Sequence, residues 1–263
     1  MSDGPGAKEG RPSPATRRNT TVRAGGTARV MLLTRAWPAP EARSDFDHWQ
    51  RTRHIPEILS ADLLQGASYW IAAEPNGRIS APWVLPGLRM ACYYAAGAPQ
   101  METWFGSAGL GDAIEDGTSW FDNFHRLDGQ LFTGNVYECA GGCPSERLGD
   151  AVLVDRWESA EPVVAADVPV EAARRYCNTL ADLAGVVSST AWMRVKWPVA
   201  VSYYRSLGSC MVWTEFDSIE ELQASLVSGE VSAAAMALQP ALVGAQYRTH
   251  EVFVRGFKLE PHD

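Results

Sequence analysis

The runs Ala67-Ser68-Tyr69-Trp70-Ile71-Ala72 and Thr190-Ala191-Trp192-Met193-Arg194-Val195 are the part of the sequence that decides the fold. Each is a short apolar run of the kind that forms a buried strand. Each precedes a loop that carries Trp and Pro and then a second apolar strand, and Trp70 corresponds to Trp192. A repeat longer than about 50 residues indicates a duplicated domain rather than a solenoid. The chain therefore reads as two copies of one structural unit.

The elements around these runs repeat in the same order. Residues 28–140 predict strand, helix, strand, strand, helix and strand, and residues 150–257 predict that order again. This order within about 100 residues is the split βαβ, or ferredoxin-like, unit. Its helices cover one face of an antiparallel sheet, and the bare face needs a partner. We therefore predict an α+β fold of two tandem ferredoxin-like (βαββαβ) modules, residues 28–143 and 148–258, packed sheet to sheet.

Local signals predict where helices begin and break. Ser218 and Glu221 form a capping box ahead of an apolar stripe, and Ser44 is a weaker candidate cap for the first helix. Pro56 lacks an N–H and clashes with the preceding turn, so the first helix must kink or restart there. His54 is therefore predicted to lie beside a break in a helix.

Composition and charge narrow the functional classes. The 263 residues are 46% hydrophobic and include 10 Trp, 8 Tyr and 8 Phe, which is enough for a sizeable core. The net charge of −8 argues against unspecific binding to nucleic acid or to an anionic membrane. No run reaches the roughly 18 apolar residues of a membrane helix. Residues 1–27 are polar and rich in Gly and Pro, which predicts a disordered tail, and residues 259–263 form a short second tail.

The five cysteines are scattered. Cys92, Cys177 and Cys210 lie in apolar segments and are predicted to be reduced core thiols, which suggests the cytoplasm. Cys139 and Cys143 bracket Ala-Gly-Gly, but no second pair of Cys or His follows nearby, so we predict no metal site.

Two segments of the first half carry a resemblance to a known family. Asp45-Phe46-Asp47-His48-Trp49 and His54-Ile55-Pro56-Glu57-Ile58-Leu59 resemble the first-helix signature of the EthD-like group in the dimeric α+β barrel superfamily. The resemblance implies a fused, pseudo-dimeric α+β barrel over residues 28–257. In the second half, Asn178 falls nearest to the position of His54, and the Pro is not kept. The first module is therefore the expected bearer of the site.

The resemblance also implies a set of activities. The superfamily includes polyketide cyclases, muconolactone-type isomerases, small quinol-forming monooxygenases, haem-degrading monooxygenases and haem-containing relatives. Most work without an organic cofactor, in a pocket between helices and sheet. The resemblance does not choose among these reactions.

Histidines are the leading catalytic candidates, because imidazole titrates near neutral pH and serves as general acid or base. His54 is the first candidate, with Glu57 one helical turn away to orient it, although a structural role in the helix turn is the alternative. His125 lies in an aromatic helical segment and is the second candidate. His48 is expected at the surface, and His250 is expected to pack in the core.

Aromatic and basic side chains are the candidate substrate-binding groups. The aromatic set, whose alternative role is core packing, is Trp49, Tyr69, Trp104 and Trp120. Arg53 and Arg89 are candidates for holding an acidic group of a substrate, although solvated arginines are the commoner case.

Three hypotheses follow. The first is a cofactor-independent enzyme that binds a small hydrophobic, aromatic or polyketide-like substrate, with His54 moving a proton in a cyclisation, isomerisation or oxygenation. The second is a haem-dependent enzyme or haem-binding protein, with His54, His125 or His250 as the axial ligand. The third is a non-catalytic partner of a biosynthetic enzyme. Motifs for nucleotide, dinucleotide, zincin and α/β-hydrolase chemistry are absent from the sequence. A fused pair of modules is compatible with a monomer or a homodimer.

Overall fold

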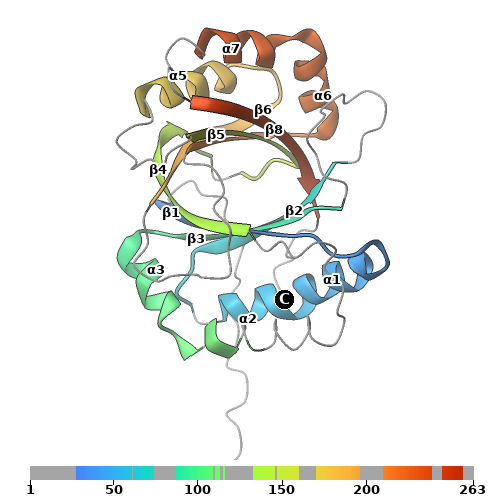
Figure 1. The fold of residues 1–263 in the computed structure, drawn as a ribbon, viewed down its shortest axis with the longest axis vertical. Helices are drawn as coiled ribbons and strands as arrows, with labels where there is room; N and C mark the ends of the chain where they lie inside the picture. The colour runs from blue at the N-terminus through green and yellow to red at the C-terminus, as the bar shows by residue number, and fades with distance from the viewer. Residues whose placement is uncertain are drawn as a thin grey trace, which may run out of the picture.

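Eight antiparallel strands close into one barrel in the computed structural model (Figure 1). The structure describes residues 28–60, 62–73, 87–108, 110–112, 115, 133–145, 147–159, 170–195, 210–238 and 245–256. The strands are β1 (Val30–Ala36), β2 (Gly66–Ala72), β3 (Arg89–Ala95), β4 (Thr133–Cys143), β5 (Ala151–Ser159), β6 (Val186–Arg194), β7 (Cys210–Phe216) and β8 (Ala245–Arg255).

The order of the strands repeats around the barrel. One side runs β4-β1-β3-β2 and the other runs β8-β5-β7-β6. The two sides join where β2 pairs with β8 and where β4 pairs with β6. The prediction of an α+β fold with two facing sheets is thus confirmed at the level of a mixed fold with an eight-stranded antiparallel barrel. The two sheets also join at their edges, which satisfies the backbone groups that open edges would leave unpaired.

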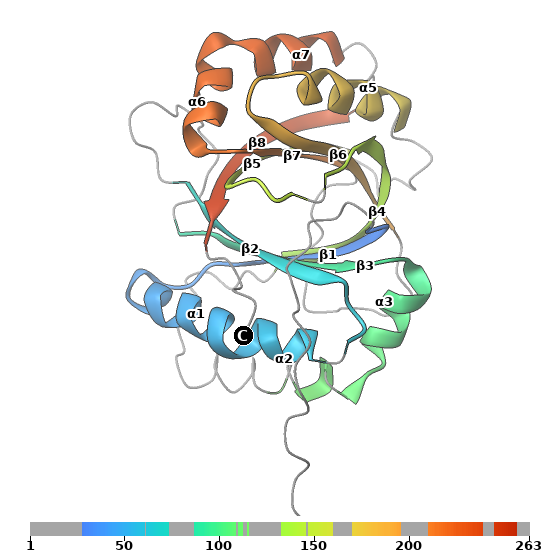
Figure 2. The same cartoon turned by 180° about the vertical axis from the view of Figure 1, so that it is seen from behind.

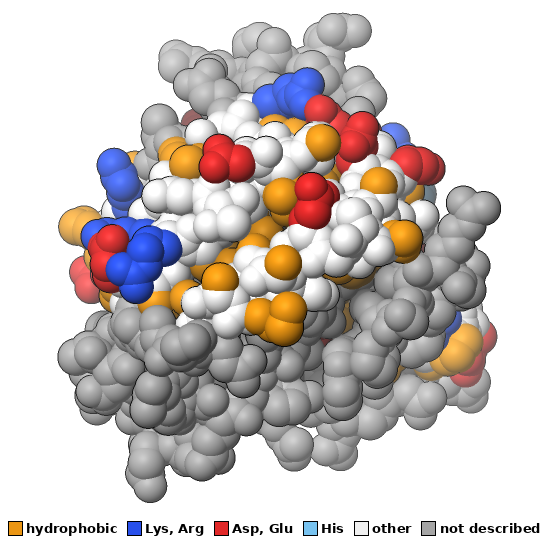
Figure 3. Space-filling view, turned by 90° about the horizontal axis from the view of Figure 1, so that it is seen from above, with side chains coloured by type: hydrophobic (Ala, Val, Ile, Leu, Met, Phe, Trp, Pro, Cys, Tyr) orange, Lys and Arg blue, Asp and Glu red, His pale blue; other side chains and the backbone are white. Residues whose placement is uncertain are grey.

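Helices cover the outside of both sides of the barrel (Figure 2). On the first side lie the 3-10 helix η1 (Pro40–Ala42), α1 (Arg43–Trp49), the π-helical segment η2 (Gln50–His54), α2 (Ile55–Leu59) and α3 (Ala98–Phe105). On the opposite side lie α5 (Val170–Ala181), α6 (Ile219–Ser228) and α7 (Glu230–Leu238). Figure 3 shows apolar side chains scattered between charged ones on that second outer face, where Val227 and Met236 are exposed.

Two of the predicted helix signals are confirmed and one is wrong. The Ser218 side chain accepts a hydrogen bond from the backbone N–H of Glu221, 3.2 Å away, as expected of an N-cap. The helix restarts at α2 with Pro56 in its first turn, and the break takes the form of the π-helical segment η2 that ends at His54. Ser44 is not a cap, because α1 already begins at Arg43 and no side chain caps it.

Alternation along the strands separates two cores. Val30 and Leu32 of β1 point outward and belong to the first core, which packs against α1, α2 and α3. Met31 and Leu33 point into the barrel and belong to the second core, which continues from the barrel interior to the layer of α5, α6 and α7. Each strand therefore presents every second residue to the enclosed interior, which we call the lumen.

The register around the lumen is the same in both halves. Arg35, Met90 and Trp70 lie opposite one another across β1, β3 and β2. Arg156, Met211 and Trp192 do so across β5, β7 and β6. Trp70 and Trp192 therefore occupy equivalent positions, as the sequence predicts.

Candidate active site in the barrel lumen

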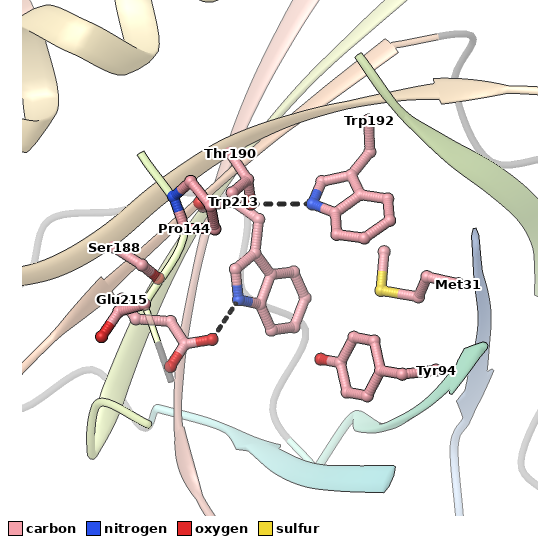
Figure 4. A pocket seen from close by; sticks show the side chains of 9 residues that line it. Met31, Tyr94, Pro144, Ser188, Thr190, Trp192, Trp213 and Glu215 are labelled. Atoms are coloured by element: carbon pink, nitrogen blue, oxygen red, sulfur yellow. Dashed lines mark hydrogen bonds between the residues drawn. The ribbon is translucent and has the colours of Figure 1, made fainter. Parts of the chain in front are cut away.

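A pocket opens in the lumen between the two sides of the barrel (Figure 4). Its lining consists of Met31, Tyr94, Pro144, Ser145, Ser188, Thr190, Trp192, Trp213 and Glu215. The pocket contains about 300 Å³ of atom-free space, solvent at its mouth included, and its closed part has room for about one water molecule. Pro144 is exposed whereas Trp213 and Glu215 are buried, so the pocket reaches solvent past Pro144.

Among the described residues that line this pocket, Glu215 carries the one carboxyl group, and its side chain lies beside the indole of Trp213 (Figure 4). The residue is only 3% exposed. Trp213 Nε1 donates to Glu215 Oε1 over 2.9 Å, and the backbone N–H of Gly149 donates to Oε2 over 2.7 Å. Both carboxylate oxygens are therefore fixed in direction.

Burial raises the pKa of the Glu215 carboxyl, because the charged form loses its hydration. The hydrogen bonds from Gly149 and Trp213 and the charge of Arg255 act in the opposite direction. A raised pKa makes the ionised carboxylate a stronger base than a solvated glutamate. Such a carboxyl can both accept and release a proton.

Gly149 can approach Glu215 because it has no side chain. A Cβ at this position would lie 2.4 Å from the backbone oxygen of Phe216 and 2.8 Å from its nitrogen. Any other residue would push the Gly149 N–H away from the carboxylate. The guanidinium of Arg255 also donates to the Gly149 carbonyl, which ties the segment to β8.

Two matching indole-to-hydroxyl hydrogen bonds hold Trp192 and Trp70 in the lumen. Trp192 Nε1 donates to Thr190 Oγ1 over 2.8 Å, and Trp70 Nε1 donates to Ser68 Oγ over 2.7 Å. In each pair the hydroxyl lies two residues before the indole on the same face of the strand. Each indole N–H is thus satisfied inside an apolar core.

The two halves meet directly at the pocket. The rings of Trp70 and Trp213 contact edge to face with centroids 5.5 Å apart. The Tyr94 hydroxyl lies 3.0 Å from Ser68 Oγ, and burial raises the pKa of Tyr94 well above its usual value. Tyr94 is therefore neutral and faces the pocket as a hydrogen-bonding hydroxyl (Figure 4).

The structure places His54 and Trp49 together, outside the lumen. Their rings stack with centroids 4.4 Å apart and 24° between the planes, on the helix layer of the first half. Trp49 is 7% exposed, and His54 is half-buried with its Nδ1 atom buried. Arg53 lies next to them but is exposed, and its Nε is 3.4 Å from Glu57 Oε1. Glu57 thus contacts Arg53 across the helical turn.

Tyr69 and Arg89 both bind Asp47 of α1. The Tyr69 hydroxyl donates to Asp47 Oδ1 over 2.6 Å, and Arg89 donates from Nε and Nη2 over 2.8 Å each. This network attaches α1 to the outer face of β2 and β3. Trp104 is 1% exposed and stacks on Tyr93 in the same layer.

Other sequence-predicted residues are only partly placed. Trp120 and His125 lie outside the described residues. His48 is exposed, as expected. His250 lies in β8, where its backbone is paired in register with Asp155 of β5. None of the predicted site residues that the structure describes lines the pocket in the lumen.

Sequence reasoning did not identify Glu215 or Trp213. The available signal was a carboxylate in the otherwise apolar run Cys210–Phe216, since a charged residue in a buried strand needs partners. The register then shows that Glu215 shares the lumen face with Trp213 and Met211. Because side chains alternate between the two faces of a strand, the spacing of Met211, Trp213 and Glu215 along β7 would have been enough to place all three in the lumen.

Among the described residues that line the lumen pocket there is no histidine. The described residues also contain no group of three or more His, Cys, Asp or Glu side chains that could hold a metal ion. Cys92, Cys177 and Cys210 are buried free thiols, as predicted, while Cys143 is exposed.

No protein-family model and no curated protein matches this chain. Similar architectures occur among solved structures. A protein proposed to be a monooxygenase from Fusobacterium nucleatum has a TM-score of 0.56 at 7% identity, over 90% of this chain and 97% of that one. An anthrone oxidase-like protein has a TM-score of 0.55 at 10% identity, over 92% and 99%. A protein proposed to be a monooxygenase from Lactobacillus acidophilus has a TM-score of 0.53 at 9% identity, over 89% and 98%.

The chain shares the overall fold of these three proteins, with its eight strands closed into one barrel. These identities are too low to carry a reaction or a substrate from one protein to another. The EthD-like resemblance of the first helix stays a prediction. In the part of the chain that the structure describes, no helix is long and apolar enough to span a membrane.

Proposed function

We propose that this chain is a small-molecule enzyme that needs no organic cofactor and binds a hydrophobic aromatic or polyketide-like compound in the lumen. The observation that carries the proposal is the buried Glu215 carboxyl, held between Gly149 and Trp213 at the wall of an aromatic pocket. A carboxyl that only stabilised the fold would not need to lie at the wall of a pocket. A perturbed carboxyl beside an aromatic hollow is the arrangement that proton transfer on a planar compound requires.

Glu215 acts as the general base and then as the general acid. In its ionised form it takes a proton from an activated C–H or O–H group of the bound compound. Trp192, Trp213 and Tyr94 provide flat or hydrogen-bonding surfaces that orient the ring. The resulting anion then cyclises, isomerises or reacts with O₂. His54 remains the alternative proton-transfer group, with a substrate held in the helix layer of the first half.

The repeated register supports a tandem origin for the two halves. We propose that residues 28–143 and 148–258 are ferredoxin-like modules of the EthD-like type. Met90 and Met211, and Arg35 and Arg156, occupy equivalent positions. The fused pair already closes its own barrel, so a cytoplasmic monomer suffices for the activity.

Anthrone is a suitable probe, because a protein of the same fold is named as anthrone oxidase-like. Removal of a proton from its CH₂ group and reaction with O₂ would give anthraquinone and water, which balances atoms and electrons. Oxygen uptake and anthraquinone formation are measured with wild type, Glu215→Gln and a protein-free control. Quenching of tryptophan emission reports binding near one or more of the 10 tryptophans of the chain, which include Trp192 and Trp213.

The expected result is quenching by anthrone in both proteins and turnover only in wild type. Equal turnover in the Glu215→Gln variant would overturn the assignment of the proton-transfer group. Binding without turnover in wild type would favour a non-catalytic binding role over an oxygenase reaction on this class of compound.

A further inference from the structure

Arg255 lies at the end of β8, where the two halves of the barrel meet. Its backbone pairs in register with Trp70 of β2, so both side chains point into the lumen. The Arg255 side chain is only 11% exposed, and its backbone N–H donates to the carbonyl of Asp150 over 2.9 Å. Burial lowers the pKa of this guanidinium, which nevertheless stays protonated in proteins. Arg255 is therefore a buried cation fixed at the seam between the halves.

The guanidinium of Arg255 contacts the segment that binds Glu215. It donates to the carbonyl of Gly149, whose own N–H donates to Glu215 Oε2 over 2.7 Å. Arg255 Nη1 is also 3.7 Å from Asp150 Oδ1, in the next residue along the chain. Among the ion pairs of the described residues, that of Arg255 is with Asp150 rather than with Glu215. The side chain therefore acts on the pocket carboxyl across Gly149.

The second donor to Glu215 is supported by the same arginine. Arg255 Cζ lies over the ring of Trp70, 5.7 Å from the ring centroid. The Trp70 ring contacts that of Trp213 edge to face, and Trp213 Nε1 donates to Glu215 Oε1. The amide donor is thus held by a direct hydrogen bond from the guanidinium, and the indole donor is held through two stacked contacts.

Arg255 also supplies a positive charge near Glu215. Burial raises the pKa of the Glu215 carboxyl, and the charge of Arg255 acts to lower it. The other groups around the carboxyl are neutral. They are Tyr94 and Cys92 of β3, whose pKa values burial raises, and the Ser188 hydroxyl opposite on β6. Within the part of the chain that the structure describes, no second cation acts on this carboxyl. A buried carboxylate needs such a charge to ionise.

We propose that Arg255 is a positioning residue of the lumen site, which holds the two donors of Glu215 in place and supplies the positive charge that the ionised carboxylate requires. This inference rests on the proposed function. Arg255 does not line the pocket, so it acts through Gly149 and Trp70. Its loss should therefore change how tightly Glu215 binds a proton while the proton acceptor itself stays in place.

The test measures proton binding at Glu215 directly. Glutamate side chains of the full chain are isotope-labelled at the carboxyl carbon, and the resonance that disappears in Glu215→Gln belongs to Glu215. Titrations by nuclear magnetic resonance are compared for wild type, Arg255→Met, Arg255→Lys and Arg147→Met. Arg147 is an exposed arginine of the segment that precedes β5, where it pairs with Asp217, and it serves as the matched control.

In Arg255→Met, Glu215 should bind its proton at least about threefold more tightly than in wild type, because the carboxylate loses a nearby cation and a firmly held donor. Arg255→Lys keeps the charge and should lie between the two, and Arg147→Met should titrate as wild type does. An unchanged titration in Arg255→Met would overturn the proposal even if the melting point falls, because a purely structural role would then suffice.

Two further outcomes are decisive. Equal changes in Arg255→Met and Arg255→Lys would overturn the assignment of the charge. If Arg255→Met does not fold, as judged by circular dichroism, Arg255→Gln replaces it. Gln is neutral but can still donate to the Gly149 carbonyl, so an unchanged titration of Glu215 in that variant would also overturn the role of the charge.

Failure of this proposal is distinguishable from failure of the proposed function, because the titration needs no substrate. Anthrone turnover is measured over the same pH range, and in Arg255→Met the rise of the rate with pH should move to higher pH by the same factor as the proton binding. A changed titration without turnover in wild type would refute the proposed function alone. Turnover that depends on Glu215 but keeps its pH profile in Arg255→Met would refute the role of Arg255 alone.

Discussion

The two halves of the chain line one lumen with matching frameworks but different ionisable groups. Ser68 and Trp70 in the first half form the same indole-to-hydroxyl bond as Thr190 and Trp192 in the second. At two other equivalent pairs of positions the halves differ. Tyr94 corresponds to Glu215, and Asn135 corresponds to Glu251.

This comparison separates the positions where both halves have the same packing residues from the positions where one half has a charged side chain. At these two pairs of positions the carboxylates come from the second half, and each faces a first-half group, Tyr94 or Arg35. The indole-to-hydroxyl bonds and the arginines Arg35 and Arg156 are shared between the halves, whereas the two carboxylates are not. A site of this kind requires both halves, because neither half alone supplies both sides of the pocket.

The largest expected effect concerns Glu251. Glu251→Gln removes the carboxylate that the buried guanidinium groups of Arg35 and Arg156 share and should lower the free energy of unfolding by about 3–5 kcal/mol. Urea unfolding followed by circular dichroism measures this. The matched control is Glu57→Gln, which breaks an exposed ion pair and should cost less than about 0.5 kcal/mol. Equal costs for the two variants would show that the lumen pair is no more important than a surface one.

Glu215 and Tyr94 provide the direct test of the divergent pair at the pocket. Glu215→Gln should reduce turnover of the anthrone probe at least about 100-fold, because it removes the proton acceptor. Tyr94→Phe should reduce it by less than about tenfold, because only a neutral hydroxyl is lost. Initial rates of anthraquinone formation separate the two. A larger loss in Tyr94→Phe would transfer the chemical role to the first half.

The pH dependence of stability sharpens the same comparison. Because burial raises the pKa of Glu215, the folded state binds this proton more tightly than the unfolded chain does. The stabilisation of the folded state by this tighter proton binding is therefore fully present at pH values below the usual glutamate pKa. It is lost as pH rises through the raised pKa of Glu215 in the folded state. Urea unfolding at a series of pH values should show this decline in wild type and a flatter profile in Glu215→Gln. The turnover rate should rise over the same range as the base ionises.

The shared framework predicts smaller effects of similar size. Ser68→Ala and Thr190→Val each remove the acceptor of a buried indole N–H and should each cost about 1–2 kcal/mol of unfolding free energy. Ser68 also contacts the Tyr94 hydroxyl, so its cost should be the larger one. If one substitution has no effect, the two tryptophans are not equivalent in energy despite their equivalent positions.

The smallest expected effect belongs to His54. If the lumen carries the reaction, His54→Gln should change turnover by less than about threefold and should leave the melting point nearly unchanged, because the ring lies on the helix layer. Loss of turnover with an intact fold would instead locate the reaction between α1, α2 and the sheet, as the family resemblance implies.

Much of the architecture could be predicted from local signals. The run of hydrophobic residues around Trp70 and Trp192, the cap at Ser218 and the break at Pro56 each depend on short-range sterics or hydrogen bonds, and all three are present in the structure. Edge-to-edge closure was not predictable in this way. It depends on pairing between strands far apart in sequence, which no local pattern contains.

The lumen site was harder to predict for a physical reason. Glu215 is meaningful only together with the N–H of Gly149, 66 positions earlier, and the indole of Trp213. Ser44 failed as a cap for a related reason, since α1 is held by Asp47 binding Arg89 and Tyr69 rather than by a local cap. In both cases tertiary contacts outweigh a local preference.

The two seams of the barrel are unequal in length. The β4–β6 seam runs from Tyr137 to Cys143, whereas among the described residues the β2–β8 seam runs from Tyr69 to Ala73, its flanking hydrogen bonds included. Transient opening should therefore begin at the shorter seam, where β8 separates from β2 while β4 and β6 stay paired. Amide hydrogen exchange should accordingly be faster at Ile71 than at Glu138. This seam ends at Arg255, whose charge favours the ionised form of Glu215, so opening of the seam should also weaken that electrostatic support of the pocket carboxylate.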